Sequence, residues 1–433
     1  MIIDFYLKNY ASFKEEQHFS LLATTKKEKF EGSELNIATQ PNGLRLLKTA
    51  VLYGANASGK SNFLKSFDVL KQLVFSIGNI ENSNSKLRIN RFLLCKETKN
   101  EPTLIEISFL IKDTIYRYGV ELSDELILSE WLYKKHKRET LVFYREGKKL
   151  DTLEKQTIIN EVWKKKMVRD DTLLLTIAAQ FNDPLSDMIL KEFLKINVIS
   201  GIYDANYKDF TIDLFSNKEE NYKDEIIELL KLADFGIENL STREEAGETV
   251  SVSFKGNDNK APIIHREAAN IKNLLTTRKV YSDKGKHIGE IEMSFNKYES
   301  EGTQKFFHLL GPILLSLKKG QLLVIDELDT KLHPLLTKQI IRLFRNPKTN
   351  PNNAQLIFAT HDINLLEAKL FRRDQIWFTE KDRFGASQLL PLSDFKKGVR
   401  NDEKISKRYM EGRYGAVPYL NDFEEYYETA MSK

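Results

Sequence analysis

The sequence has very little cysteine and no strong excess of either charge. Cys95 is the single cysteine among 433 residues. The chain can therefore form no internal disulfide framework and no cysteine-rich zinc cluster, which fits a reducing cytoplasm. Lys and Arg number 66 against 62 Asp and Glu, so the net charge is only +4. This balance excludes a histone-like or tail-type nucleic-acid binder, although it allows a local basic face.

Long apolar runs are also missing. A membrane-spanning helix needs about 18 consecutive apolar residues, and the most apolar run, 307–317, is interrupted by His308, Gly311, Pro312 and Ser316. The first residues alternate like a strand and carry neither a basic region nor a cleavage site, so we expect no signal peptide. We expect a soluble, cytoplasmic protein without a membrane partner.

What is present is enough apolar sequence for a sizeable core, 41% of residues with 11% aromatic, in patterns that predict an α/β fold. Before residue 134, one helix at 60–75 is accompanied by strands at 2–10, 49–53, 104–109, 115–122 and 130–133. After residue 290, helices at 306–317 and 335–344 alternate with strands at 322–325, 356–359 and 375–378. This alternation favours a mostly parallel sheet that is covered on both faces.

The middle of the chain has a different character. Helical patterns occur at 154–166, 171–181, 185–194 and 222–232, and the polar stretch 244–273 contains one candidate strand at 250–254. We predict one α/β head, a mixed sheet with flanking helices, formed by residues 1–133 and 286–380. A mostly helical insertion of residues 134–285 interrupts this head, and a tail of residues 381–433 follows it.

The strongest signal is a glycine-rich loop between a predicted strand and a predicted helix. Residues 54–61 match the phosphate-loop pattern G-x4-G-K-[ST], in which backbone N–H groups at a helix N-terminus surround phosphates. Lys60 would bridge the β- and γ-phosphates, and the Ser61 hydroxyl would ligate Mg²⁺. The flanking strand and helix argue against a chance glycine turn. The predicted nucleotide-binding residues are Gly54, Asn56, Ala57, Ser58, Gly59, Lys60, Ser61 and Asn62.

Two predicted strands end in side chains that suit phosphate chemistry. Asp326 directly follows the predicted strand 322–325 and can hold the Mg²⁺ hydration shell. Glu327, the next residue, can orient or deprotonate the attacking water. Alone, such an acidic pair is usually a turn with a helix cap, but the phosphate loop favours the catalytic interpretation. His361 ends the next strand and could touch a γ-phosphate, although a lone histidine is more often structural. Asp329 could organise a neighbouring subunit.

A further anion site is suggested where a helix begins near residue 305. Residues 300–304, Ser-Glu-Gly-Thr-Gln, would expose free N–H groups, although serine is also a common helix cap.

The order of these motifs resembles that of the ATP-binding-cassette (ABC) ATPases: a phosphate loop, a Ser-x-Gly-x-Gln segment, an acidic strand and a strand-end histidine. Within these, the set is most similar to the SMC/RecF-like branch, which includes the ATPases of overcoming-lysogenization-defect nucleases.

The resemblance covers about residues 1–133 and 286–380 and implies ATP hydrolysis with Mg²⁺. It also implies a homodimer or higher homo-oligomer that holds two ATP molecules between head-to-tail sites. The nucleotide on the phosphate loop of one subunit would then meet residues of the other subunit. These residues are Ser300, Gly302, Thr303 and Gln304, and Asp329 is counted with the nucleotide-binding residues.

Two segments narrow the resemblance to phage-defence ATPases. The opening residues 5–13 resemble the first strand of small bacterial ATPases from phage-defence operons. The tail motif 409–418, YMEGRYGAVP, also resembles these ATPases, notably the RloA and AbiL type, and the AriA ATPase of PARIS is similar in architecture. Those ATPases act beside a separate effector. The resemblance therefore implies a RloB-type or Toprim-type nuclease partner, with nucleic acid or a phage protein as the trigger. We expect no fused nuclease, because too little sequence follows residue 380 for a domain of roughly 100 residues.

Several alternatives remain open. The runner-up function is a RecF-like repair ATPase that binds DNA directly, and a third is a scaffold that uses ATP only as structural glue. A transporter subunit is disfavoured, because the insertion is large and residues 91–94 offer no Q-loop glutamine. Residues 300–304 also depart from the transporter form of the signature, since they lack its leading Leu and second Gly.

Other features have simpler interpretations. The basic clusters 134–138 and 164–166 are interleaved with acidic residues, so we interpret them as a solvated face rather than a nucleic-acid grip. The aromatic residues of 423–427 belong to a terminal helix or to a docking peptide. Cys95 is interpreted as a small core residue.

Overall fold

The computed structural model describes residues 1–25, 28, 30, 32–76, 89–217, 221–253, 263–367, 369–395, 404–418, 424, 427 and 431. These residues form two compact units, which are described separately. The larger unit comprises Met1–Ile202, Ser316–Thr330 and Thr337–Lys433. The smaller unit comprises Tyr203–Leu315 and Lys331–Leu336.

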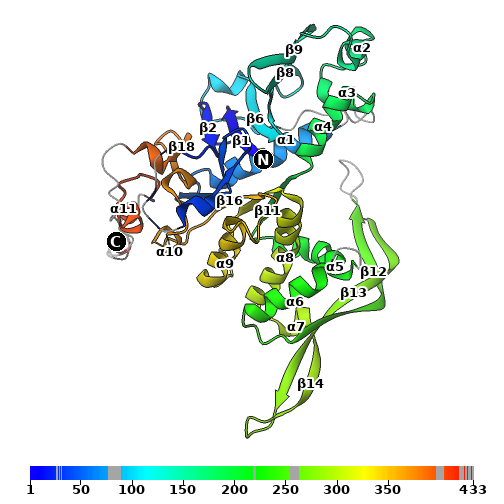
Figure 1. The fold of residues 1–433 in the computed structure, drawn as a ribbon, viewed down its shortest axis with the longest axis vertical. Helices are drawn as coiled ribbons and strands as arrows, with labels where there is room; N and C mark the ends of the chain where they lie inside the picture. The colour runs from blue at the N-terminus through cyan, green and yellow to red at the C-terminus, as the bar shows by residue number, and fades with distance from the viewer. Residues whose placement is uncertain are drawn as a thin grey trace. The chain divides into compact units, whose positions relative to one another are not determined.

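An antiparallel sheet of seven strands forms one layer of the larger unit, in the order β10-β9-β8-β7-β6-β1-β2 (Figure 1). Its strands are β1 (Ile2–Lys8), β2 (Gln17–Ser20), β6 (Thr103–Ile111), β7 (Thr114–Leu122), β8 (Ile127–Lys135), β9 (Glu139–Glu146) and β10 (Lys149–Thr152). Strands β6 and β7 are joined by a tight turn at Lys112, whose φ of 52° gives the left-handed conformation that such turns use.

The second sheet has six strands in the order β11-β15-β16-β5-β17-β18. They are β5 (Thr49–Gly54), β11 (Ile196–Ser200), β15 (Leu322–Asp326), β16 (Gln355–Ala359), β17 (Ile376–Lys381) and β18 (Ser387–Pro391). All neighbours are parallel except β17 and β18, so the sheet is mixed. Every residue of β5 and β16 is buried, which explains why these strands read as continuous apolar runs rather than alternating ones.

Helix α1 (Lys60–Phe75) supplies a large share of the larger unit's core. Its buried residues recur at helical spacing, and Phe67 stacks on Phe5 of β1 with ring centroids 4.1 Å apart. The same core includes Val324 of β15 and Ile357 of β16. The apolar stripe of α1 is thus continuous with residues of both sheets, and this fixes the helix that begins at the phosphate loop.

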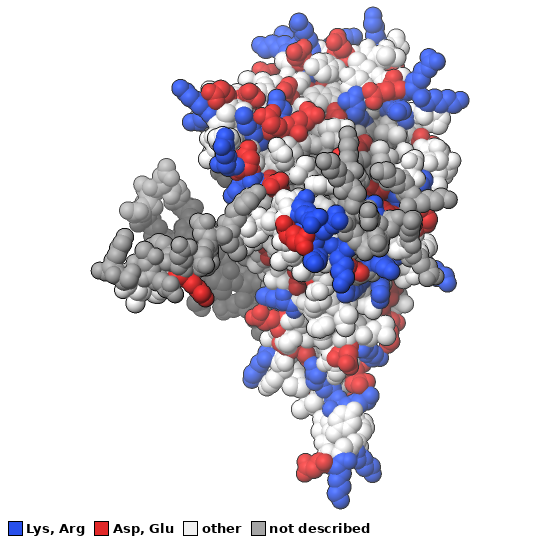
Figure 2. All heavy atoms as spheres, turned by 90° about the vertical axis from the view of Figure 1, so that its left-hand side faces the viewer, with Lys and Arg blue, Asp and Glu red and all other residues white. Residues whose placement is uncertain are grey.

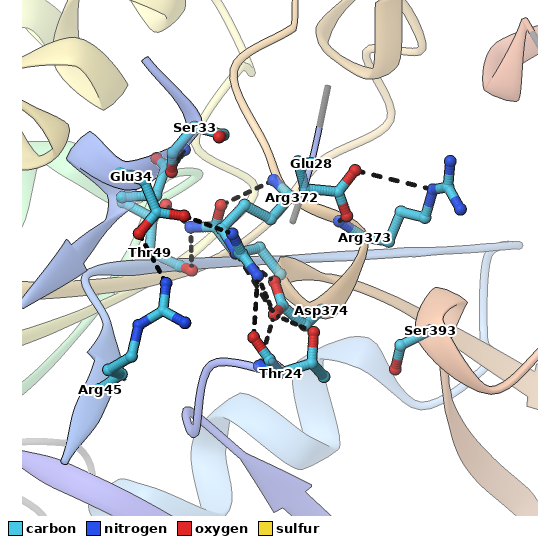
Figure 3. Close-up of polar contacts among 12 residues, drawn as sticks. Thr24, Glu28, Ser33, Glu34, Arg45, Thr49, Arg372, Arg373, Asp374 and Ser393 are labelled. Carbon is cyan, nitrogen blue, oxygen red and sulfur yellow. Dashed lines mark hydrogen bonds and ion pairs between the residues drawn. The ribbon is translucent and has the colours of Figure 1, made fainter. Parts of the chain in front are cut away.

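A buried ionic network joins the N-terminal segment to the turn before β17, the 3-10 helix η4 (Arg373–Gln375) (Figure 3). Arg372 is fully buried, and its Nε and Nη2 each donate to Asp374 at 3.0 Å. Asp374 Oδ2 also accepts from the backbone and hydroxyl of Thr24, at 2.8 and 2.9 Å. Gln375 donates to the carbonyl of Thr49 at 2.7 Å. The start of β17 is therefore anchored to the start of β5, the strand that leads into the phosphate loop.

Shorter elements complete the larger unit. They are η1 (Ser33–Asn36), β3 (Ile37–Thr39), β4 (Arg45–Leu47), η2 (Thr98–Asn100), α2 (Ile158–Lys164), α3 (Leu174–Gln180), α4 (Pro184–Phe193), α10 (Asn364–Glu367), η5 (Leu392–Asp394) and α11 (Ile405–Met410).

The smaller unit combines helices with a three-stranded antiparallel sheet in the order β12-β13-β14. Its elements are η3 (Asp204–Tyr207), α5 (Lys208–Ser216), α6 (Tyr222–Leu232), β12 (Asn239–Ser253), β13 (Ile263–Tyr281), β14 (His287–Ser294) and α7 (Phe295–Tyr298). Helices α8 (Glu301–Lys319) and α9 (Pro334–Arg345) begin in this unit and end in residues assigned to the larger one. In α8, buried His308 accepts or donates a 2.7 Å hydrogen bond with Asp204.

The α/β class, with a large sheet and flanking helices, is confirmed. The expectation of a mostly helical insertion at 134–285 is corrected, because strands β9, β10, β11, β12 and β13 all lie in this range. The expected boundary after residue 133 falls inside β8, and the antiparallel sheet continues through β9 and β10. Strands β9, β10, β12 and β13 carry many polar residues, which weakens the apolar alternation that identifies a strand.

Candidate functional site

The candidate site lies at one edge of the six-stranded sheet, within the larger unit. Strands β5, β16 and β15 are parallel neighbours, so their carboxyl ends meet at the same edge. The phosphate loop follows β5, His361 follows β16, and Asp326 ends β15. In open α/β sheets, ligands bind at such strand ends. The structure therefore brings together the loop, the acidic pair and the histidine that the sequence predicted; we call this the nucleotide edge.

Close packing against β17 accounts for the first glycine of the loop. A Cβ added at Gly54 would overlap the Thr379 hydroxyl and lie 2.6 Å from the Ser58 Oγ. Ser58 and Thr379 share a buried hydrogen bond of 2.6 Å. The Ser58 side chain thus holds the loop to β17, and the Ser58 backbone N–H donates to the Ala55 carbonyl at 3.2 Å within the loop.

The second glycine is required by both conformation and space. Gly59 has a φ of 111°, and a Cβ there would lie 2.6 Å from the Ser387 Oγ and 2.8 Å from the Ser12 Oγ. Asn62 donates to the same Ser12 hydroxyl at 2.9 Å, so its side chain supports the loop. Because Gly59 has no side chain to cap α1, the first N–H groups of that helix are available to an anion. The loop tip, Asn56 and Ala57, is exposed.

Lys60 places a buried positive charge inside the loop. Its Nζ donates to the carbonyls of Gly54 at 2.7 Å and Ala55 at 3.1 Å. Burial lowers the pKa of Lys60, and the carboxylates of Asp326 and Glu327 oppose that shift. Phosphate oxygens can replace these main-chain carbonyls as hydrogen-bond acceptors for the Lys60 ammonium group.

Asp326 and Ser61 form a pair that suits a hard cation. The Ser61 hydroxyl hydrogen-bonds to Asp326, while among the described residues Asp326 Oδ1 has no hydrogen-bond partner. Burial raises the pKa of Asp326, and the hydrogen bond from Ser61 opposes the shift. A buried carboxylate oxygen without a donor beside a hydroxyl fits Mg²⁺, which takes one or two protein oxygens and completes its shell with phosphates and water. In the described part of the chain, no group of three or more His, Cys, Asp or Glu forms a dedicated metal site.

Glu327 is held in a strained backbone conformation directly after β15. Its φ is 56°, a value that non-glycine residues rarely adopt. The hydroxyl of Thr330 donates to its carboxylate at 3.1 Å. Gly201, after β11, donates its N–H to the Asp326 carbonyl at 2.7 Å, and a Cβ at Gly201 would overlap the Glu327 carbonyl. The turn that aims Glu327 is therefore fixed from the neighbouring strand.

His361 lies against Asp329 and within electrostatic range of the acidic pair. The His361 backbone N–H donates to Asp329 Oδ2 at 3.4 Å, and Asp329 Oδ1 finds no hydrogen-bond partner within the described residues. Burial and then the charge of Lys60 lower the pKa of His361, whereas Asp329 and Glu327 raise it. The imidazole is consequently neutral near pH 7, with one ring N–H to donate.

The Ser300–Gln304 segment belongs to the smaller unit, whereas the nucleotide edge belongs to the larger one. Ser300 accepts from the Thr303 N–H at 3.2 Å and bonds to the Thr303 hydroxyl at 2.9 Å. Gln304 donates to the carbonyl of Glu299 at 2.9 Å. A Cβ at Gly302 would lie 2.8 Å from the Lys331 carbonyl. This segment is the capped first turn of α8, as serine in that position favours.

Sequence reasoning missed the residues that support the nucleotide edge from other strands. Gly201 follows the apolar run of β11, and that run before a glycine was a usable strand signal. Thr379, Ser387 and Ser12 carry no comparable signal, because ordinary hydroxyl residues acquire their role only through the packing of distant segments.

The minor features have simple outcomes. Cys95 is half-buried and donates to Glu97 at 3.1 Å, so the expectation of a core residue was wrong. Lys134 pairs with Glu154 and Lys165 with Glu161, and on the face in Figure 2 basic and acidic side chains are interspersed. These pairs agree with a solvated face. Of residues 423–427, positions 423, 425 and 426 lie outside the described residues.

Comparison with known proteins gives one match that covers most of the chain. The model of a family described as "AAA domain, putative AbiEii toxin, Type IV TA system" matches residues 50–367. The match begins in β5 and ends in α10, so it includes every residue of the nucleotide edge. No curated protein matches the sequence. Among the described residues, no helix is both long and apolar enough to span a membrane.

Proposed function

Because the chain belongs to the family of AAA domains described as putative AbiEii toxins of type IV toxin–antitoxin systems, we propose that it hydrolyses ATP at the nucleotide edge. The observation that carries this proposal is the meeting of Lys60, Glu327 and His361 with Asp326, whose free oxygen lies beside Ser61. Family membership supports a P-loop ATPase in general, and these residues supply the groups that phosphoryl transfer requires.

Binding begins with the phosphates at the loop. The N–H groups of the first turn of α1 receive phosphate oxygens, and Lys60 leaves the carbonyls of Gly54 and Ala55 for the β- and γ-phosphates. Ser61 and Asp326 would hold Mg²⁺, which neutralises phosphate charge when bound. Asn56, at the exposed loop tip, lies where it can contact the phosphates from outside.

Hydrolysis follows from the two strand-end residues. Glu327 accepts a proton from the attacking water, and its carboxylate lies within electrostatic range of Lys60 in the loop. Neutral His361 donates a hydrogen bond to the γ-phosphate, where negative charge develops as the bond to the leaving oxygen breaks. The products are ADP and phosphate.

The use of this reaction is proposed from the family and from the resemblance of residues 5–13 and 409–418 to phage-defence ATPases. ATP closes two copies head to tail, so that Ser300–Gln304 of one copy meets the γ-phosphate held by the other. Hydrolysis in this dimer controls a separately encoded effector, of RloB or Toprim nuclease type, after nucleic acid or a phage protein is sensed. Asp329, whose Oδ1 has no partner among described residues, is available to the second copy.

Phosphate release by the purified full chain tests the enzymatic part. Lys60→Ala should lower kcat by about 10²- to 10³-fold, the scale of losing one group that stabilises transition-state charge. Lys137→Ala, an exposed lysine in the turn between β8 and β9, is the matched control and should turn over ATP like the wild type. Equal kcat for Lys60→Ala and wild type would refute the proposed reaction.

Direct DNA binding tests the RecF-like alternative. If the isolated chain binds duplex DNA with an affinity that falls steeply as the salt concentration rises, contacts to DNA phosphates dominate the binding. Such a result would favour the RecF-like function. The paired lysines of β8 and α2 lead us to expect weak binding that is lost by physiological salt. An effector role instead predicts that a nuclease-type reading frame lies beside this one and that its product co-purifies with this chain.

A further inference from the structure

The tail motif 409–418 packs directly on the strand beside the phosphate-loop strand. Phe378 of β17 stacks with Tyr409 at 5.4 Å and 18° and with Tyr414 at 5.2 Å and 15°. Phe395 meets the Tyr414 ring edge-on at 5.3 Å. Tyr409 and Tyr414 are only 7% and 3% exposed, so the motif is part of the core and not a surface peptide. We call residues 404–418 the tail brace.

The unusual backbone of the tail brace serves this packing. Gly412, Gly415 and Ala416 have φ values of 72°, 64° and 60°. A Cβ at Gly415 would lie 2.5 Å from the Glu380 carboxylate, so this glycine lets the backbone approach β17. The Tyr409 hydroxyl donates to the Ala416 carbonyl at 3.2 Å and closes the turn. Gly415 and the two tyrosines thus fix the tail on β17.

Tyr53 connects the tail brace to the catalytic histidine segment. Its ring meets Tyr409 edge-on at 5.8 Å, and it immediately precedes Gly54 of the phosphate loop. Its hydroxyl donates to the carbonyl of Asp362 at 3.0 Å, and Asp362 is the residue after His361. A second link joins the Ser406 N–H to Glu367 of α10 at 2.9 Å.

Tyr53 is suited to a permanent hydrogen bond. It is 1% exposed, and burial raises its pKa well above the ordinary value, so the hydroxyl remains a donor over the whole physiological range. The Thr360 N–H donates to the Leu52 carbonyl at 3.2 Å, which holds the same segment from the β5 side. His361 therefore sits between two attachments to β5, and one of them depends on a ring that the tail brace covers.

We propose that the tail brace positions His361 for ATP hydrolysis, acting through the hydrogen bond from Tyr53 to the Asp362 carbonyl. Tyr53 and Tyr409 are positioning residues, since neither touches the phosphates. This proposal rests on the ATPase function proposed above and adds that the tail can control the rate. A partner that displaced residues 404–418 would slow hydrolysis without emptying the phosphate loop.

Steady-state kinetics of Tyr53→Phe test the hydrogen bond alone, because the ring that packs on Tyr409 is kept. Loss of one such bond should lower kcat about three- to tenfold, with KM for ATP within about twofold of wild type. Unchanged kcat, or a fall in kcat matched by an equal rise in KM, would overturn the proposal. Wild-type turnover measured in parallel separates the two claims: an inactive wild type refutes the proposed function, and with it this inference.

A second pair of variants tests the tail itself. Tyr409→Ala should lower kcat at least as much as Tyr53→Phe and should speed amide hydrogen exchange in residues 361–367. Tyr409→Phe keeps the stacking and loses only the hydroxyl that bonds to the Ala416 carbonyl, so its kcat and its exchange in residues 361–367 should lie much nearer wild type than those of Tyr409→Ala. If Tyr409→Ala speeds exchange only in residues 404–418, or if Tyr409→Phe is as slow as Tyr409→Ala, the coupling to His361 is wrong.

Discussion

The nucleotide edge of the larger unit and the Ser300–Gln304 segment of the smaller unit differ in whether their polar side chains have hydrogen-bond partners. At the nucleotide edge, one oxygen each of Asp326 and Asp329 lacks a partner among described residues, and main-chain carbonyls hold Lys60. In the Ser300–Gln304 segment, Ser300 bonds to Thr303 and Gln304 bonds to the Glu299 carbonyl.

This difference indicates what each region does before a nucleotide arrives. A buried oxygen without a hydrogen-bond partner lowers the stability of the fold. Binding of phosphate and Mg²⁺ at the nucleotide edge would supply the missing partners and remove this cost. The Ser300–Gln304 segment does not carry this cost, because its side chains already stabilise the first turn of α8. We therefore expect substitutions at the edge to act on chemistry and substitutions in the segment to act on stability and assembly.

The largest effect is expected at the strained turn after β15. Glu327→Gln should lower kcat by about 10²- to 10⁴-fold, the usual contribution of a general base, while ATP affinity stays within a few-fold. Phosphate release and calorimetric ATP binding measure the two quantities. Glu146→Gln, an exposed acid at the end of β9, is the control and should behave as wild type.

A second substitution separates the effect of Asp326 on Mg²⁺ binding from its effect on the stability of the fold. Asp326→Asn should lower Mg²⁺-dependent turnover, by less than Glu327→Gln does, and yet raise the melting temperature. The reason is that burial raises the pKa of Asp326, so the folded state disfavours the charge that the protein carries at neutral pH. Thermal unfolding without nucleotide and kcat across a Mg²⁺ titration test both parts. A lower melting temperature for Asp326→Asn would contradict the claim that the buried Asp326 carboxylate destabilises the protein when no nucleotide is bound.

The pH dependence of the wild type follows from the same raised pKa. Because the pKa of Asp326 lies above the ordinary value of 3.8, the carboxylate takes up a proton, and so loses its capacity to bind Mg²⁺, at a higher pH than a free Asp. The Mg²⁺ concentration for half-maximal turnover should rise as the pH falls toward that pKa. A half-maximal concentration that stays constant down to pH 4 would show that the pKa of Asp326 is not raised.

In the Ser300–Gln304 segment the expected effect is smaller and thermodynamic. Ser300→Ala removes the hydroxyl that caps α8 and should lower the free energy of unfolding by about 0.5–2 kcal/mol. Denaturant unfolding measures this loss, and Ser393→Ala serves as the serine control, because the Ser393 hydroxyl, in η5, bonds to the neighbouring Asp394 side chain and caps no long helix. A loss of ATP affinity in Ser300→Ala without destabilisation would show that the Ser300 hydroxyl contacts nucleotide and does not serve to cap α8.

The smallest effect concerns His308 in α8. Burial lowers its pKa below the ordinary 6.5, with the hydrogen bond to Asp204 opposing. Below about pH 6.5 the unfolded chain therefore binds a proton that the folded chain does not, and stability falls as the pH drops toward the folded pKa. His308→Gln should flatten this part of the profile, whose slope from a single proton is at most about 1.4 kcal/mol for a change of one in pH. Unfolding curves of the wild type and of His308→Gln between pH 7.5 and 5.5 measure this difference. Equal slopes of the free energy of unfolding against pH in the two proteins would contradict the prediction.

The sequence predicted the nucleotide edge well because its signals are local. An apolar run, a glycine pattern and a helical stripe fix β5 and α1 within one continuous segment, and the predicted helix at 60–75 coincides with α1. The supporting contacts were not predictable, since Ser58 meets Thr379 across 321 positions of sequence. The candidate strand at 250–254 overlaps only the end of β12, and the rest of β12 and all of β13 were not predicted. Their sequences are polar, and it is their pairing with each other that makes them strands.

Mixing two inactive variants tests most directly whether the nucleotide edge of one copy is completed by the Ser300–Gln304 segment of another. Lys60→Ala disables the loop and leaves the segment intact, whereas Ser300→Arg blocks the segment at an exposed position and leaves the loop intact. In a two-fold head-to-tail dimer, each mixed dimer regains one complete site. An equal mixture should thus recover about a quarter of wild-type turnover. A mixture no more active than the two variants measured apart would contradict a shared site.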